Sequence, residues 1–542
     1  MISSLTIDRR LLLQTGALGL IGLATPGAAQ ILTLRGFTHG VASGEPSASS
    51  VLLWTRYVSD GETKLRVEIA GDSAFAKVIS GCEVVASPAH DNCAKVTLTG
   101  LPENSWLYYR FIAPDGSMSP VGRTRTLPSG RCDRFRLGVF SCSNMGFGYF
   151  NAYGHAAARG DIDLAVHLGD YFYEYGYGTY PSMKQWVSGR IIQPDHETVS
   201  LADYRLRFAS YRADPDLRRL HQVLPMISVW DDHEIANDPW VGGAQNHQSE
   251  EGDWAVRKKA AIKAYVEWMP VSDKMWRQYQ IGDLATIQMP ETRITARSKQ
   301  FEYDEIISGK ADPAAALAAF RDGAWHDKSR TLMGKDQEAW FARGLSESVK
   351  AGTRWQVFAQ QVIMGGTVSP PEAANWTGPD APDYILKRVE MGQLAAKAGL
   401  PFNLDSWDGY PAARERVYTF AQAAGANLIV LTGDSHNAWA FDLADKAGRA
   451  VGVEFAGHSV SSNGMEGSTR GVSEADRSAA IRRANPGLKW CNTESRGYMA
   501  VTLERDRATS DYIFMDTVKQ RSRTVKNSVT QTVQRGQNRL AV

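Results

Sequence analysis

The sequence has almost no excess charge of either sign. It contains 60 Lys and Arg against 59 Asp and Glu, a net charge of +1, which gives no indication of a nucleic acid or a charged membrane surface as partner. Beyond residue 30 it also lacks any segment long and apolar enough to cross a bilayer, any internal repeat and any low-complexity tract. These absences leave an ordinary globular chain of 542 residues, long enough for two or more domains and a large core.

Cysteine is also scarce, with five residues: Cys82, Cys93, Cys132, Cys142 and Cys491. An odd number leaves at least one thiol unpaired. Cys82 and Cys93 flank a polar loop between two strand-like runs, and we expect a disulfide that closes this hairpin. Cys142 follows an apolar run directly and is the candidate for a functional thiol.

The first 30 residues differ from the rest of the chain. The pair Arg9-Arg10 precedes an apolar run over residues 11–24, and small residues follow at 26–29. This order predicts a twin-arginine export signal over residues 1–30, and therefore a periplasmic or extracellular protein that meets the twin-arginine export machinery. A retained N-terminal anchor is the alternative.

Two domains follow, and they differ in their pattern of predicted strands and helices. Residues 31–127 contain short strand candidates separated by turns, which predicts a β-sandwich resembling a fibronectin type III domain. Residues 133–520 alternate between strands and helices, which predicts an α/β domain, and residues 298–327 look like an insertion or helical cover that tunes access. Residues 521–542 are polar and rich in arginine, and we expect a weakly ordered tail or a terminal helix.

Four apolar runs of the second domain each end in a polar cluster. The runs are residues 135–140, 164–168, 225–230 and 427–431, and the clusters are Cys142, Asp170 with Tyr173, Asp231-Asp232-His233, and Asp434 with His436. Sites in open α/β sheets form beyond the carboxyl ends of strands, so we expect these side chains to meet. Four such endings by chance are improbable.

The chemistry of these side chains predicts a mixed metal centre. A tyrosine, whose pKa is about 10, binds divalent ions poorly, whereas a trivalent ion such as Fe(III) holds the phenolate at neutral pH. Asp170, Asp232 and Asp434 supply the oxygen ligands that Ca²⁺, Mn²⁺ or Mg²⁺ prefer. His233 is the candidate general acid for a leaving alkoxide, with Asp231 orienting it or another ligand.

Each motif has a plainer interpretation when it is taken alone. Residues 231–234 also suit a helix start with an aspartate N-cap, residues 433–436 a turn, and Cys142 a buried structural thiol. Tyr173 alone suits the core or the surface. A glycosidase pair at Asp231 and Asp232 is disfavoured, because adjacent residues rarely direct two carboxyl groups at one bond. The joint pattern favours the metal centre over each of these.

The combination of motifs resembles the PhoD-like alkaline phosphatase and phospholipase D family, within the metallophosphoesterases. The matching segments are residues 40–46 and 53–56 in the first domain, and 140–142, 169–174, 230–234, 405–410, 433–436 and 496–498 in the second. They span nearly the whole chain beyond the signal, in order. One departure is Glu291-Thr292-Arg293, where the family more often has Asp-Thr-Arg.

The resemblance implies a catalytic domain of four layers, with two mixed β-sheets between helices, behind the β-sandwich. It also implies a cofactor set of Fe(III) and Ca²⁺. By match of motif, Cys142, Asp170 and Tyr173 should hold the iron, with Asp170 bridging to calcium, and Asp232, Asp434 and His436 should complete the cluster.

The activity that the resemblance implies is hydrolysis of phosphate esters by attack of metal hydroxide on phosphorus. Phosphate monoesters are the first expectation for the substrate. A phospholipase D-type phosphodiesterase is the alternative within the same class. A degenerate protein that only binds a surface is the alternative from another class, and the intact set of candidate ligands argues against it.

Overall fold

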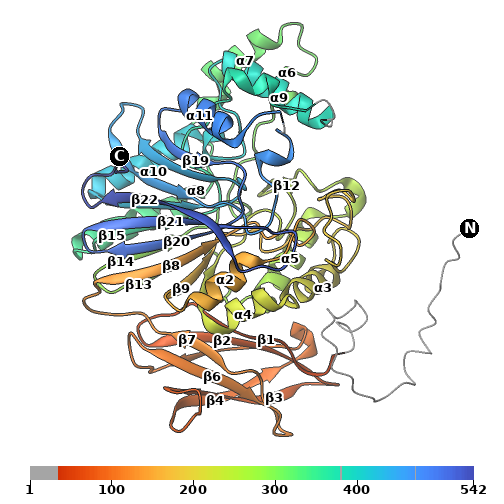
Figure 1. The fold of residues 1–542 in the computed structure, drawn as a ribbon, viewed down its shortest axis with the longest axis vertical. Helices are drawn as coiled ribbons and strands as arrows, with labels where there is room; N and C mark the ends of the chain where they lie inside the picture. The colour runs from red at the N-terminus through yellow and green to blue at the C-terminus, as the bar shows by residue number, and fades with distance from the viewer. Residues whose placement is uncertain (1–33, 379–380, 382, 470, 542) are drawn as a thin grey trace, which may run out of the picture.

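The computed structural model describes residues 34–378, 381, 383–469 and 471–541. The predicted export signal therefore lies outside the described residues. Three larger sheets carry the fold, and helices cover two of them (Figure 1). Within the described ranges every helix is too short or too polar to span a bilayer.

A nine-stranded mixed sheet forms the centre of the molecule. Its strands are β1 (Gly36–Gly44), β2 (Ser50–Val58), β5 (Cys93–Thr99), β8 (Arg134–Phe140), β9 (Leu164–His167), β10 (Pro225–Ser228), β20 (Gly497–Glu504), β21 (Arg507–Met515) and β22 (Val525–Gln534). They are ordered β22-β21-β20-β8-β9-β10-β1-β2-β5. The three strands β8, β9 and β10 are parallel neighbours, so their carboxyl ends lie at one edge.

A second sheet of seven strands packs against the first. It contains β13 (Arg277–Ile281), β14 (Ala285–Met289), β15 (Trp355–Ala359), β16 (Leu428–Thr432), β17 (Ala438–Ala444), β18 (Ala450–Ala456) and β19 (Leu488–Asn492). Its order is β13-β14-β15-β16-β18-β17-β19. A two-stranded ribbon, β11 (Pro239–Trp240) with β12 (Gly243–Ala244), lies apart from both.

The helices pack on the faces of the two sheets or lie in the segments that connect strands. They are α2 (Asn151–Arg159), α3 (Leu201–Arg212), α4 (Pro215–Val223), α5 (Trp254–Trp268), α6 (Tyr303–Ile307), α7 (Pro313–Asp322), α8 (Gly334–Lys350), α9 (Asp383–Lys397), α10 (Pro411–Ala424) and α11 (Glu474–Ala484). The helices α3, α4 and α5 begin at Ser200, Asp214 and Asp253, whose side chains accept hydrogen bonds from the first-turn amides.

The four layers follow from strands that are apolar on both faces. In β16, Ile429 and Leu431 face the core between the two sheets, while Leu428 and Val430 face the helices α8, α10 and α11. The nine-stranded sheet divides its side chains in the same way, between that core and a second one under α2, α3, α4 and α5. This period of two explains the continuous apolar runs, and it confirms the predicted four-layer fold.

The N-terminal sandwich shares a sheet with the catalytic unit. One of its layers is β1, β2 and β5, and the other is a four-stranded sheet of β3 (Thr63–Ala70), β4 (Val78–Ala86), β6 (Trp106–Ile112) and β7 (Gly122–Arg125), ordered β4-β3-β6-β7. Strand β1 pairs in parallel with β10, at Ser43 with Pro225 and Gly44 with Met226. A side chain at Gly44 would meet the Pro270 carbonyl oxygen at 2.0 Å, so only glycine permits this approach.

Two expectations about this part of the chain are wrong. The thiols of Cys82 and Cys93 are free, because β4 and β5 belong to different sheets and do not form a hairpin. Residues 525–534 of the predicted tail form β22, which pairs antiparallel with β21 over its whole length. The polar residues of β22 suit an edge strand with one exposed face.

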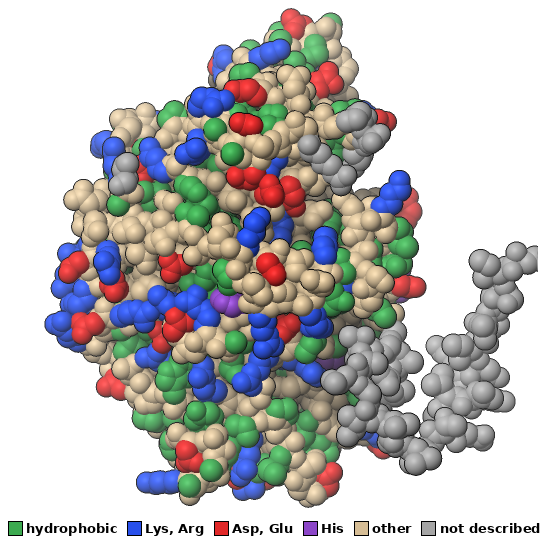
Figure 2. Space-filling view, viewed as in Figure 1, with side chains coloured by type: hydrophobic (Ala, Val, Ile, Leu, Met, Phe, Trp, Pro, Cys, Tyr) green, Lys and Arg blue, Asp and Glu red, His purple; other side chains and the backbone are tan. Residues whose placement is uncertain are grey.

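A small lobe stands above the catalytic layers (Figure 1). The helices α6 and α7 lie in the predicted cover at residues 298–327, and the lobe has its own small core around Tyr303, Leu317 and Phe320. Over the visible face, basic and acidic side chains both occur, in keeping with the small net charge (Figure 2).

Candidate metal centre

Three strand ends deliver four of the predicted site residues in strained backbone conformations. Cys142 follows β8, Asp170 follows β9, and Asp434 and His436 follow β16. Their φ angles are 60°, 54°, 59° and 61°, in the left-handed region that non-glycine residues seldom adopt. Such strain persists where the surroundings impose it, and it concentrates at functional sites.

Gly169 allows the turn that presents Asp170. Its φ is 101°, and a Cβ there would lie 2.3 Å from the Asp231 backbone nitrogen. The loop after β9 therefore passes directly against the loop after β10. Glu234 fastens the two loops together, since its carboxylate accepts hydrogen bonds from the backbone N–H groups of Asp170 (3.1 Å), Tyr171 (2.6 Å) and Asp231 (2.9 Å).

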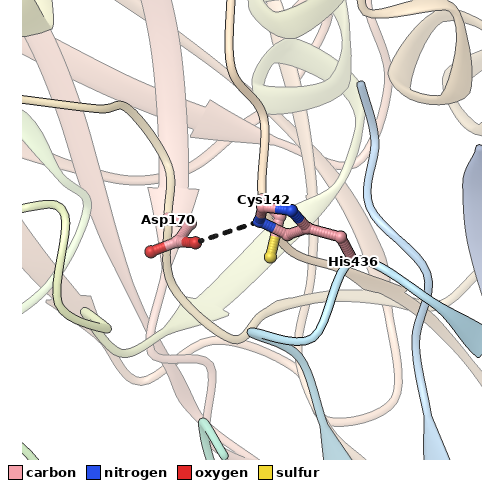
Figure 3. Close-up of side chains that lie close together, drawn as sticks. All are labelled: Cys142, Asp170 and His436. Atoms are coloured by element: carbon pink, nitrogen blue, oxygen red, sulfur yellow. Dashed lines mark ion pairs between the residues drawn. The ribbon is translucent and has the colours of Figure 1, made fainter. Parts of the chain in front are cut away.

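The first group of candidate ligands is Cys142, Asp170, Tyr173 and His436. Ligand atoms of Cys142, Asp170 and His436 lie within 4.8 Å of one another, and Figure 3 shows the imidazole directed at the carboxylate beside the sulfur. The Tyr173 hydroxyl lies 3.0 Å from both Asp170 Oδ2 and His436 Nε2. The structure therefore brings these four side chains together.

Hydrogen bonds outside this group fix two of its members. His436 Nδ1 donates to the Asn463 carbonyl at 2.7 Å, which leaves the lone pair of Nε2 facing Asp170 and Tyr173. Ser462 donates its hydroxyl to the Tyr173 oxygen at 2.8 Å. Both partners come from one loop, so that loop orients the imidazole and the phenol together.

The pKa values in this group all favour neutral ligands. Burial raises the pKa of the Cys142 thiol and of the Tyr173 hydroxyl well above their usual values, and the neighbouring Asp170 raises both further. Burial lowers the pKa of His436 to about 3. A bound cation reverses this situation for the thiol and the phenol, because it stabilises their anions directly.

The second group consists of Asp231, Asp232 and Asp434, whose oxygens also lie within 4.8 Å of one another. Arg293 lies in the middle of these acids with no exposed surface. Its Nε donates to Asp231 Oδ1 at 2.5 Å and its Nη2 to Asp434 Oδ1 at 3.2 Å. Asp231 therefore pairs with Arg293 rather than with His233, and of its two predicted roles only the orientation of another ligand stays a prediction.

Glu174 orients His233 instead. Its Oε2 lies 2.7 Å from His233 Nδ1, and its Oε1 accepts hydrogen bonds from Asn237 N and Asn246 Nδ2. Burial by itself would lower the pKa of His233, but the carboxylates of Asp232 and Glu174 raise it well above its usual value. These carboxylates favour the protonated imidazole, and its Nε2 lies on the side of Asp232, 4.0 Å from Oδ2.

Three buried carboxylate oxygens fit the binding of cations. Asp170 Oδ1, Asp231 Oδ2 and Asp232 Oδ1 have no hydrogen-bond partner among the described residues. A buried acceptor without a partner is unfavourable, and bound ions satisfy such atoms. The donor set, with a thiol, a phenol, an imidazole and several carboxylates, also suits one trivalent ion and one divalent ion with oxygen ligands.

Several residues that hold this site could not be recognised from local sequence patterns. Glu174 and Glu234 lie inside the segments 169–174 and 230–234, but the residues that they bind lie far away in sequence. Glu234 binds the amides of Asp170 and Tyr171, 64 and 63 positions away, and Glu174 binds the amide of Asn237, 63 positions away. Arg293 was visible only as part of Glu291-Thr292-Arg293. Glu291 itself accepts hydrogen bonds from the backbone N–H groups of Arg293, Ile294 and Thr295, so the longer acid caps this turn.

Comparison with known proteins agrees with this geometry. The "PhoD-like phosphatase" family profile matches residues 137–512, and the "PhoD-like phosphatase, N-terminal domain" profile matches residues 24–128. Alkaline phosphatase D of Bacillus subtilis (strain 168) is 31% identical over 99% of this chain and 89% of its own. A solved structure titled "Structure of PhoD" superposes with a TM-score of 0.76 at 30% identity, covering 94% of this chain and 92% of the other.

Four layers around two sheets, with a buried acidic centre beyond the strand ends, define a metal-dependent hydrolase of phosphate esters. The chain belongs to the PhoD-like phosphatase family.

Proposed function

We propose that this protein is an exported phosphatase that hydrolyses phosphate monoesters with Fe(III) and Ca²⁺ as its ions. The observation that carries the proposal is the convergence of Cys142, Asp170, Tyr173 and His436 on one centre beside a second acidic group. The family and the similarity to alkaline phosphatase D support the reaction class.

The donor chemistry supports a division of the ligands between the two ions. Cys142, Asp170 and Tyr173 would hold the iron, and their proximity to His436 Nε2 favours that imidazole as a fourth ligand there. Asp232 and Asp434 would hold calcium, with Asp170 between the two positions. When bound, these ions supply Lewis acidity, which lowers the pKa of water and neutralises charge on a phosphate.

His233 would donate the proton that the leaving alkoxide needs. The carboxylates of Asp232 and Glu174 raise the pKa of His233, which favours the imidazolium, and Glu174 holds the ring by Nδ1 so that Nε2 would be the donor. A positioned general acid typically contributes about 10²–10⁴-fold to the rate. The Tyr173 ring packs against the His233 imidazole, with 4.1 Å between the ring centroids, and this contact limits other orientations of His233.

A substrate panel tests the preference for monoesters. We expect metal-loaded protein to turn over a nitrophenyl phosphate monoester faster than the bis(nitrophenyl) diester, and phosphatidylcholine most slowly. Faster cleavage of the diester or the lipid would instead support the phospholipase D-type alternative. Absence of bound iron together with no turnover of any of the three after addition of iron and calcium would overturn the enzymatic proposal.

Export is proposed from Arg9, Arg10 and the apolar run that follows them. We expect Arg9→Lys with Arg10→Lys to keep the protein in the cytoplasmic fraction with its signal uncleaved, while Lys184→Arg, on an exposed loop, leaves the distribution unchanged. Fractionation of cells followed by immunoblotting measures the outcome. Equal export of the double variant would contradict a twin-arginine route.

A further inference from the structure

One fully buried arginine differs from the others in the described part of the chain. Six arginines are among the largest side chains with no more than 2% exposure: Arg207, Arg212, Arg257, Arg293, Arg297 and Arg477. The other five donate hydrogen bonds, for example Arg207 to the Pro194 carbonyl and Arg477 to the Thr493 hydroxyl. Arg212 differs, because its Nε, Nη1 and Nη2 have no acceptor in hydrogen-bond geometry among the described residues, and the one side chain that interacts with the guanidinium as a hydrogen-bond partner is the neutral Tyr171 hydroxyl.

The surroundings of Arg212 offer no carboxylate partner in the described structure. It is the last residue of α3, and its guanidinium carbon lies 4.2 Å from the ring centroid of Trp54 on β2. The nearest acid in sequence, Asp214, is already occupied: Oδ1 accepts from the amides of Asp216 and Leu217, and Oδ2 from Arg190 Nη1 at 2.7 Å. A buried cation without a counter-charge is strongly unfavourable.

Two buried histidines beside Arg212 also have free ring nitrogens. His221 on α4 is fully buried, its Nε2 lies 2.8 Å from the Tyr171 hydroxyl, and its Nδ1 has no partner in the described structure. His39 on β1 is 5% exposed and its Nδ1 is likewise without a partner there. These side chains come from the sandwich on one side and the helices on the other.

Electrostatics support the same grouping. Burial lowers the pKa of His39 well below its usual value, and the charges of Arg56, Arg212 and Arg218 lower it further. Burial lowers the pKa of His221 in the same way, and Arg212 again adds to the effect. Both imidazoles are therefore neutral, and a neutral ring that accepts the Tyr171 proton at Nε2 presents an N–H donor at Nδ1.

We propose that a small inorganic anion, a halide or inorganic phosphate, binds Arg212 between the N-terminal sandwich and helices α3 and α4, with His221 Nδ1 as a second donor. The anion supplies the negative charge that no carboxylate provides for Arg212 in the described structure. It would stabilise the contact between β1, β2 and the helices that follow the Asp170–Tyr173 loop. The site is separate from the metal centre, and it does not depend on the proposed activity.

Crystals of the metal-loaded protein test the site directly. We expect a soak in bromide to give an anomalous difference peak within hydrogen-bond distance of the Arg212 guanidinium, and a phosphate soak to show whether a tetrahedral anion displaces it. Ordered water at Arg212 in both soaks, with no anomalous peak, would overturn the proposal. The Arg212→Met variant should lose the peak.

Unfolding in solution gives a second readout that is independent of turnover. At constant ionic strength in gluconate, each tenfold rise in chloride above its Kd should raise the unfolding temperature by about 1 °C, because an anion that binds only the folded state stabilises it by mass action. In Arg212→Met this dependence should vanish, and Arg219→Met, which replaces an exposed arginine on α4 that bonds Gln222, should retain it. If Arg212→Met does not fold, Arg212→Gln replaces it in the same titration. Parallel curves for the parent and its Arg212 variant would count against the site.

Discussion

At the residue scale, four side chains of the candidate metal centre come from residues whose backbone is in the left-handed region. Each left-handed residue among Cys142, Asp170, Asp434 and His436 costs about 1–3 kcal/mol relative to a relaxed backbone. Hydrogen bonds from outside the group, such as those to Glu234 and Asn463, impose these conformations. The strain presents the four side chains inward from loops only a few residues long, before any ion is bound.

The role of Tyr173 is the sharpest prediction at this scale. We expect iron-loaded protein to show a visible charge-transfer band from the Tyr173 phenolate, and Tyr173→Phe to abolish it while the protein remains folded. The control is Tyr175→Phe, which also removes a tyrosine hydroxyl. The ring of Tyr175 has its centroid 5.6 Å from that of His233, but Tyr175 is not one of the predicted ligands. Absorption spectra with iron content measured on the same samples give the answer. An unchanged band in Tyr173→Phe would show that another residue is the ligand.

How far the sequence predicts the site depends on where each partner lies. Cys142, Asp170 and Asp434 could be found because each follows a buried apolar run, and strand ends of one edge meet. Glu174 could not be given its role, because the contact with His233 spans 59 residues and no local pattern encodes it. The same holds for Arg293, whose contact with Asp434 spans 141 residues.

At the scale of elements, Glu454 on β18 links the strands that carry the site. Its carboxylate accepts from the amides of Met364 and Gly365 and from the Thr432 hydroxyl, two residues before Asp434. Burial raises the pKa of Glu454 to about 7, although these donors favour the ionised form. A buried acid on a central strand therefore makes the pairing of β16 with β18 sensitive to pH.

The sign of that sensitivity follows from proton binding. Between the usual value near 4.5 and about 7, the folded protein holds the Glu454 proton and the unfolded chain does not. Stability is therefore lost as pH rises through this window. In Glu454→Gln, which cannot ionise, the free energy of unfolding relative to the parent should rise by about 2–3 kcal/mol from pH 4.5 to 7.5.

Urea unfolding at several pH values measures this difference. Glu83→Gln, on the exposed face of β4, is the control and should track the parent at every pH. A difference between Glu454→Gln and the parent that does not vary with pH would show that Glu454 is ionised in the folded protein throughout.

Elements with an alternating or continuous apolar pattern could be predicted, and edge elements could not. The runs at 135–140 and 427–431 became β8 and β16 within a residue or two, because both faces are buried. The polar segment that became β22 has few buried residues, and its identity comes from pairing with β21 rather than from its own pattern. The strands that contain Cys82 and Cys93 can also be predicted from their sequence pattern. That these two strands belong to different sheets cannot, because the pattern does not show which strands pair.

At the scale of the whole molecule, the shared nine-stranded sheet makes the sandwich and the catalytic layers one cooperative unit. Beyond the β1–β10 pairing, Trp54 Nε1 donates to the Glu267 carbonyl at 2.8 Å, and Lys95 Nζ donates to the Val271 carbonyl at 2.7 Å. These two contacts join residues 213 and 176 positions apart in sequence. Such an interface is formed by main-chain and buried side-chain contacts, and not by a flexible linker.

The ion pair between the partly exposed Glu45 and the buried Arg277 tests this cooperativity. Glu45 follows β1, lies 2.5 Å from Arg277 Nε and also accepts from the amide of Ser272. Glu45→Gln leaves the guanidinium buried without its counter-charge, and we expect a loss of about 3 kcal/mol in the free energy of unfolding. Because the two parts share a sheet, calorimetry should show one transition in the parent and one in the variant, shifted to lower temperature. Asp60→Asn, which breaks the exposed pair with Arg35, should leave the transition where it is. Two separate transitions in the parent would show instead that the sandwich folds and unfolds without the catalytic layers.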